Sequence, residues 1–182
     1  MPGDLKYRDI NGDGSITSED MVMMSPYGSN PGIQYGFGVS LTYRKFDISV
    51  FFNGSGNRKI FLDPAWVQPF NQSWTADRNL MRWIADGYWK EGADNSSAVW
   101  PRLGTAQAQQ ENNLVSSTFW MKDVSFLRFK TFEVGYSFPH CRVYLSGDNL
   151  AVWSPFKYWD PELYFSTYPL SRTFNIGVQV NF

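Results

Sequence analysis

The sequence predicts an all-β protein: an antiparallel transmembrane β-barrel, of which this chain supplies about the last five strands. Aromatic residues make up 18% of the chain, yet the mean hydropathy is only −0.36. No apolar run approaches the ~18 residues of a membrane helix, whereas a membrane strand needs about 9–11 residues with every second one apolar. Several segments have that alternation, and two tight turns separate long connections.

The clearest strand covers residues 172–182. Its apolar residues fall on one face and its polar residues on the other, which is the period of a half-buried strand. Alternation alone does not separate a barrel from a sandwich, but a chain that ends on an aromatic residue favours the barrel. The apolar residues are also candidates for a C-terminal assembly signal: Phe174, Ile176, Val178, Val180 and Phe182.

Four further strands are predicted, over residues 34–43, 46–53, 124–138 and 141–150. Small residues alternate with large ones in the first two, although Phe51 interrupts the polar face. The alternation in 124–138 changes phase near Lys130 and Thr131, which predicts a β-bulge there. Arg44-Lys45 and Pro139-His140 form the tight turns.

The connections orient the strands, because outer-membrane barrels have short periplasmic turns and long extracellular loops. The tight turns are therefore periplasmic, and residues 54–123 and 151–171 are extracellular loops. Residues 1–33 form another extracellular segment, and residues 34–182 form the barrel part. Within the longest loop, 74–90 has helical spacing, with Ser73 or Thr75 as a candidate cap, and 92–113 is expected to be irregular. Five strands cannot close a barrel, so the remaining wall must come from other sequence.

One extracellular motif predicts a structural calcium site. Asp9 to Asp20 has the spacing of an EF-hand loop, with Gly14 at the sharp turn and Asp20 where a longer Glu is usual. The shorter carboxylate predicts weak binding, like that of extracellular modules at about 10⁻⁴ to 10⁻³ M. The alternative is a solvated turn without metal. The candidate ligands are Asp9, Asn11, Asp13, Ser15, Thr17 and Asp20.

Other classes of function find little support. With 16 basic and 17 acidic residues and no basic stripe, nucleic acid is not an expected partner. Cys141 is the only cysteine, so no intrachain disulfide forms. An enzyme is not expected, because His140 is alone in a turn, the Asp160-Pro161-Glu162 carboxylates lie in a loop, and no Gly-x-Ser-x-Gly elbow occurs.

Two rival hypotheses remain at this stage. A secreted, calcium-stabilised β-sandwich that binds carbohydrate would share the alternation, the tryptophans and the calcium loop. It would bury the apolar face of the last strand, which a barrel exposes to lipid. The second rival is a truncated product without transport function, because residues 1–4 show no signal-peptide pattern and the barrel hypothesis requires this chain to be a fragment.

An ordered set of segments resembles the C-terminal part of SusC/RagA-type TonB-dependent transporters. The resemblance extends over almost the whole chain and is carried by residues 3–14, 35–43, 46–54, 100–103, 117–123, 126–130, 134–139, 143–150 and 172–174. They include Trp100-Pro101-Arg102-Leu103 and Val143-Tyr144-Leu145-Ser146-Gly147-Asp148-Asn149-Leu150.

The resemblance implies a barrel of about 22 strands with a plugged lumen in the cell outer membrane. It implies import of oligosaccharide or peptide, a SusD-like surface lipoprotein partner, and coupling to the TonB complex through a plug and a TonB-binding segment at the missing N-terminal end. The last strand, ending at Phe182, looks like the signal read by the barrel-assembly machinery. We expect the loop tryptophans mostly to pack the loops, to form the interfacial girdle or to meet the lipoprotein: Trp66, Trp74, Trp83, Trp89, Trp100, Trp153 and Trp159.

Overall fold

The structure is a computed structural model that describes residues 1–27, 29–70, 72–73, 76–77, 80–105, 107–163 and 167–180. The chain folds into two compact units. Unit 1 comprises Met1–Pro26 and Phe61–Lys122, and unit 2 comprises Tyr27–Ile60 and Asp123–Phe182. Residues 61–122, which the sequence assigned to a loop, therefore form a compact unit together with the N-terminal segment.

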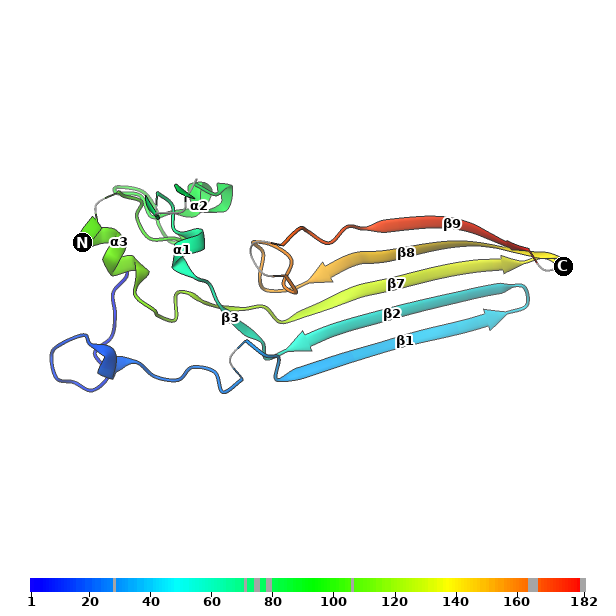
Figure 1. Cartoon of the computed structure of the whole chain (residues 1–182), viewed down its shortest axis with the longest axis horizontal. Coiled ribbons are helices and arrows are strands. Elements are labelled where there is room, and N and C mark those ends of the chain that lie inside the picture. Colours follow the sequence, from blue (N-terminus) through cyan, green and yellow to red (C-terminus); the bar gives the residue numbers. More distant parts are fainter. Residues whose placement is uncertain are drawn as a thin grey trace. The chain divides into compact units, whose positions relative to one another are not determined.

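Unit 2 is built on one five-stranded antiparallel sheet with strand order β1-β2-β7-β8-β9 (Figure 1). The strands are β1 (Ile33–Tyr43), β2 (Phe46–Gly56), β7 (Phe126–Ser137), β8 (Cys141–Trp153) and β9 (Thr173–Val180). Each pairs with its predecessor in this order, as in a β-meander. Residues 181 and 182, which include the predicted terminal Phe182, lie outside the described residues.

The predicted bulge in β7 is confirmed. Phe52 of β2 is paired with Phe129, while Phe51 is paired with Thr131, so Lys130 is the extra residue on β7. The register between β7 and β8 shifts at the same place. The side chains of β7 therefore alternate between the two faces of the sheet in opposite phase before and after Lys130.

The two faces of the sheet differ in chemistry along neighbouring rows. One row crosses all five strands with only aliphatic side chains, and the adjacent row crosses them with only polar ones. The first row is Leu41, Ile48, Val134, Leu145 and Ile176, and the second is Ser40, Ser49, Glu133, Ser146 and Asn175. We call these faces the apolar face and the polar face.

The apolar face is not covered by any element that the structure describes. Ile176 is 82% exposed and Leu41 is 62% exposed on the two edge strands, and Ile48 and Leu145 are still 39% and 41% exposed on the inner strands β2 and β8. A β-sandwich would bury this face against a second sheet. The exposed apolar row therefore argues against the sandwich and fits a barrel wall in lipid.

Phe51 is an exception on the polar face, and the structure gives the reason. Its ring lies against Gly36 and Gly38 of the neighbouring strand, where an added Cβ would come within 3.1 Å of the ring. The two glycines provide the flat surface on which this large side chain packs.

Unit 1 contains short elements. They are the 3₁₀ helix η1 (Ser18–Asp20), α1 (Pro64–Val67), β4 (Gln72–Ser73), β5 (Ala76–Asp77), α2 (Arg82–Gly87) and α3 (Gln107–Leu114). The chain passes between the units through β3 (Lys59–Phe61) and β6 (Met121–Asp123). Among the described residues, no helix has the length and hydropathy that a membrane span requires.

Two predictions for this region were wrong. The helix expected over 74–90 is only Arg82–Gly87, and its N-cap is Met81, whose side chain caps nothing, instead of Ser73 or Thr75. Position 75 lies outside the described residues. Part of 92–113 was expected to be irregular but belongs to α3, whose Gln, Ala and Glu residues favour a helix without any apolar period.

An aromatic cluster forms the core of unit 1. Trp100 packs edge-to-face against Trp83, Phe119 and Trp120, each with ring centroids 5.3 Å away. Trp120 is fully buried, and its indole N–H donates to the Asn113 carbonyl at 3.1 Å. Such contacts join residues that are far apart in the sequence and that do not recur at a regular spacing. A periodic sequence pattern therefore cannot predict them.

Candidate functional site

Arg128 is the centre of a charged cluster on the polar face of β7. Its side chain is only 1% exposed. Its Nη2 donates to Asp160 at 2.6 Å, and its Nη1 donates to Asn149. Its Nε lies 2.7 Å from Glu162 without an aligned hydrogen bond, so that contact is an ion pair. Two carboxylates thus compensate one buried guanidinium, as buried charges require.

The cluster ties down the segment that follows β8. Asp160 also accepts a hydrogen bond from the Glu162 amide at 3.0 Å. At the start of the segment, the Ser154 hydroxyl donates to the Ser125 carbonyl at 2.7 Å and accepts from the Phe156 amide at 3.1 Å. Residues 154–163 are therefore anchored at both ends to β7 and to its N-terminal flank.

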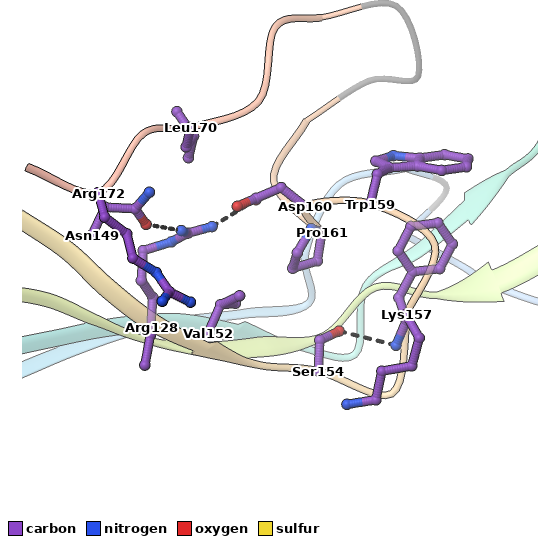
Figure 2. Close-up of a pocket in the computed structure, with 12 residues that line it drawn as sticks. Arg128, Asn149, Val152, Ser154, Lys157, Trp159, Asp160, Pro161, Leu170 and Arg172 are labelled. Carbon is purple, nitrogen blue, oxygen red and sulfur yellow. Dashed lines mark hydrogen bonds and ion pairs between the residues drawn. The ribbon is translucent and has the colours of Figure 1, made fainter.

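A pocket of about 330 Å³ lies beside this cluster. Figure 2 shows Arg172 and Asn149 next to the Arg128 guanidinium, with Asp160 on its other side and Lys157 across the pocket near Ser154. Trp159 and Phe156 belong to the same lining, and the Trp159 indole donates to the Leu163 carbonyl at 3.2 Å. The pocket therefore combines cationic groups with aromatic surface.

A second charged cluster lies on the polar face near the turn between β7 and β8. Arg142 donates to Glu133 at 2.6 Å and reaches Asp47 of β2 with both Nε, at 3.0 Å, and Nη2. Next to it, the Tyr144 ring lies against Gly177 of β9, where an added Cβ would come within 2.3 Å of the ring. The charged side chains of the polar face are thus paired with one another, whereas those on the exterior of a sandwich would be solvated.

The predicted calcium ligands form a closed loop in unit 1. Asp9 accepts hydrogen bonds from the amides of Gly12 at 2.6 Å and Gly14 at 2.8 Å, and Asp13 accepts one from Ser15 at 2.8 Å. Gly14 has φ +84°, the left-handed conformation that a glycine adopts without strain. The side-chain Oδ1 of Asn11 accepts from the Asp13 main-chain amide at 3.0 Å.

Asp20 closes the loop from the other end. Its carboxylate accepts from the Ile10 amide at 2.7 Å and from the Thr17 amide at 2.8 Å. These hydrogen bonds, the Thr17 amide first, lower the pKa of Asp20 below its usual value. Among the described residues, no three His, Cys, Asp or Glu side chains are placed to hold a metal by themselves. Calcium in this loop would therefore also need the Asn11 amide and main-chain oxygens.

The C-terminal strand presents its predicted face as an exposed row. Phe174, Ile176, Val178 and Val180 are all more than half exposed. Phe182 falls outside the described residues.

The tryptophans named from the sequence occupy different places. Trp100 is buried and Trp83 packs against it in unit 1, whereas Trp153 is 53% exposed on the apolar face at the end of β8. Trp159 lines the pocket. Trp89 is half-buried in unit 1. Trp74 and the side chain of Trp66 lie outside the described residues.

Comparison with known proteins shows which proteins the chain is similar to. The chain is 28% identical to the TonB-dependent receptor P26 and 24% identical to the TonB-dependent receptor P3, both of Formosa agariphila. These matches cover 99% and 100% of this chain but only 20% and 19% of the receptors. The chain is therefore similar over its whole length to TonB-dependent receptors. The chain thus spans about a fifth of the length of the curated relatives it matches, and no family model matches it.

Solved structures share the fold of this chain. It superimposes on the RagAB peptide importer in the closed-closed state with a TM-score of 0.65 and 22% identity, over 99% of this chain and 20% of the other. The open-open state gives a TM-score of 0.60 and 21% identity, over 85% and 17%. The predicted fold class and outer-membrane location are confirmed.

Sequence reasoning missed Arg128 as a site residue. Asp160 and Glu162 were noticed only as loop carboxylates, and Arg128 only as part of a family-like segment. The available signal was an arginine in an apolar strand beside a bulge, which a strand pattern would otherwise place toward lipid.

Proposed function

We propose that this segment belongs to a TonB-dependent importer that takes oligosaccharides or peptides across the outer membrane. The observation that carries the proposal is the pair of adjacent rows across the sheet, one aliphatic and one polar. A wall with these two faces separates lipid from a wet interior large enough for cargo. The relatives named as TonB-dependent receptors and the RagAB peptide importer support the same function.

The proposal includes partners that act on the whole protein. A SusD-like surface lipoprotein captures cargo above the barrel, and the likeness of this chain to the RagAB peptide importer supports such a partner. The TonB complex supplies energy through a region outside this chain. The barrel-assembly machinery inserts the protein and reads its last strand, whose apolar residues are exposed along β9.

Uptake in cells tests the function. A strain that lacks the gene is compared with its complemented strain for growth on peptides and on oligosaccharides as sole carbon source. Growth on one of these classes should require both the gene and a working TonB system. Equal growth of the deletion and complemented strains on every cargo of both classes would reject an importer.

A matched pair of variants tests the wall. Ile176→Lys places a charge on the lipid face, at a cost of about 2–4 kcal/mol at the bilayer midplane. Asn175→Lys places the same charge on the polar face of the same strand. We expect I176K to lower the amount of folded protein in the outer membrane, measured by its heat-dependent migration in gels, and N175K to leave it nearly unchanged. Equal loss in both variants would contradict this assignment of faces.

We also propose that residues 9–20 bind calcium as a structural ion. Asp9, Asp13 and Asn11 follow the alternate spacing of a calcium loop, and each of their oxygens that accepts an amide hydrogen bond retains a second lone pair. Asp13→Ala should remove calcium binding, measured by calorimetry on the intact protein, without abolishing barrel assembly. The control is Asp94→Ala, because Asp94 is another exposed aspartate that accepts from a nearby amide, that of Ser96 at 2.9 Å. Unchanged calcium binding by D13A would remove the metal assignment.

A further inference from the structure

The pocket next to Arg128 has an excess of positive charge. Three cationic side chains line it, Arg128, Lys157 and Arg172, against one carboxylate, Asp160. All of them belong to unit 2. A pocket with this lining attracts an anion.

The cations are not equivalent. Arg128 is buried and already compensated by Asp160 and Glu162. Arg172 and Lys157 form no side-chain hydrogen bond or ion pair within the part of the chain that the structure describes. The positive charge available to a ligand is therefore that of Arg172 and Lys157.

The position of Arg172 points to a specific kind of ligand. Figure 2 shows its guanidinium reaching into the pocket toward Arg128, a group of like charge. An anionic oxygen group bound there would offset this repulsion. A guanidinium presents a planar fork of donors, which matches the two oxygens of a carboxylate or a sulfate.

The rest of the lining fits the body that carries such a group. Trp159, Phe156 and Pro161 provide apolar and aromatic surface. Asn149 is held in place, because its carbonyl oxygen accepts from Arg128 and its amide donates to the Ser171 carbonyl at 3.1 Å. A volume of about 330 Å³ is at the lower end of small-molecule sites, so one terminal residue or one sugar ring fits.

We propose that this pocket binds an anionic oxygen group of the cargo, with Arg172 as its direct ligand and Lys157 contributing to the positive field. The proposal rests on the proposed function in so far as the ligand is cargo. The same chemistry has two sources: the terminal carboxylate of a peptide and an acidic substituent, such as sulfate, on an oligosaccharide.

Calorimetry on the intact protein in detergent tests this with paired probes. One pair is tetraalanine and its C-terminal amide, and the other is a sulfated galactan tetrasaccharide and its desulfated form. We expect at least one charged probe to bind about tenfold more tightly than its neutral partner, equivalent to about 1.4 kcal/mol. Which pair shows the preference identifies the source of the anion.

The variants assign that preference to Arg172. Arg172→Gln should reduce the preference to about twofold or less, while Arg172→Lys, which keeps the charge, should keep part of it. Lys45→Gln removes one positive charge from the turn between β1 and β2 and serves as the matched control. The proposal is overturned if no charged probe is preferred, if R172Q keeps the full preference, or if K45Q lowers it as much as R172Q.

The outcome is separable from that of the uptake experiment. Cells that import cargo normally, with a protein that shows no charge preference at the pocket, would reject this inference and leave the function intact. A preference that depends on Arg172, in a protein whose deletion affects no uptake, would retain the pocket and reject the importer.

Discussion

The buried Arg128 cluster allows a prediction about the segment after β8. Arg128→Met keeps the apolar stem of the side chain and removes the charge and all donors. Asp160 and Glu162 would then lose their ion-pair partner, and Asn149 would lose its donor. We expect residues 154–163 to detach from the polar face while the strands stay paired.

The size of the effect follows from burial. Removing one member of a fully buried ion pair costs about 3–5 kcal/mol, largely because an uncompensated charge remains. The remaining carboxylates are partly wet, with side chains 14% exposed for Asp160 and 31% exposed for Glu162, so water recovers part of this loss. We therefore expect about 3 kcal/mol, which is on the order of a 100-fold rise in the open population of the segment.

Hydrogen exchange measures that population directly. Peptides covering 154–163 should exchange about 100-fold faster in R128M than in the wild type, and the amides of Phe156 and Glu162 are the informative reporters. The control is Arg142→Met, which removes the same groups from a second cluster of the same sheet. Unchanged exchange in R128M, or equal acceleration in R142M, would refute the idea that Arg128 anchors this segment.

Three further predictions concern other parts of the chain. Gly177→Ala should lower the free energy of unfolding in detergent by about 1–3 kcal/mol because its methyl group meets the Tyr144 ring, and the loss should largely disappear in a Tyr144→Ala background. Because the pKa of Asp20 is lowered in the folded loop, its hydrogen bonds stabilise the loop fully above about pH 4 and are lost as the pH falls through the folded-state pKa. Hydrogen exchange of the Thr17 amide should therefore accelerate, relative to its intrinsic rate, as the pH falls through that value in the wild type. The variant D20N should show no such transition. Trp120→Ala should destabilise unit 1 by about 3–5 kcal/mol and expose it to protease, because the side chain is fully buried.

The sheet could be predicted from sequence because its information is local. Apolar residues recur in each strand with period two, so a window of about ten residues is enough to identify the strand and to assign its residues to two faces. The turns and the bulge in β7 were accessible for the same reason, since each changes the phase of a local pattern. The loop at 9–20 is equally local: its hydrogen bonds connect residues no more than 10 positions apart.

Unit 1 and the pocket could not be predicted in that way. The core of unit 1 joins Trp83, Trp100 and Trp120, which no period relates. Helix α3 has polar residues on all sides, so it gives no amphipathic signal although its residues favour helices. Arg128 and Asp160 are 32 positions apart, and their meeting depends on the path of the chain after β8.

One extra residue in β7 connects the wall to the pocket. Along an unbroken strand, Arg128 would share the face of Phe132 and Val134 and would point into lipid, where a central arginine costs about 2–4 kcal/mol. The bulge at Lys130 reverses this relation, because Thr131 pairs with Phe51 and Phe129 with the next residue, Phe52. Phe129 then stacks on Phe52 at 4.8 Å on the apolar face, and Arg128 turns to the polar face, where Asp160 and Glu162 reach it. The bulge therefore fixes the apolar surface of the wall and, in the same step, the position of the charge beside which the pocket is built.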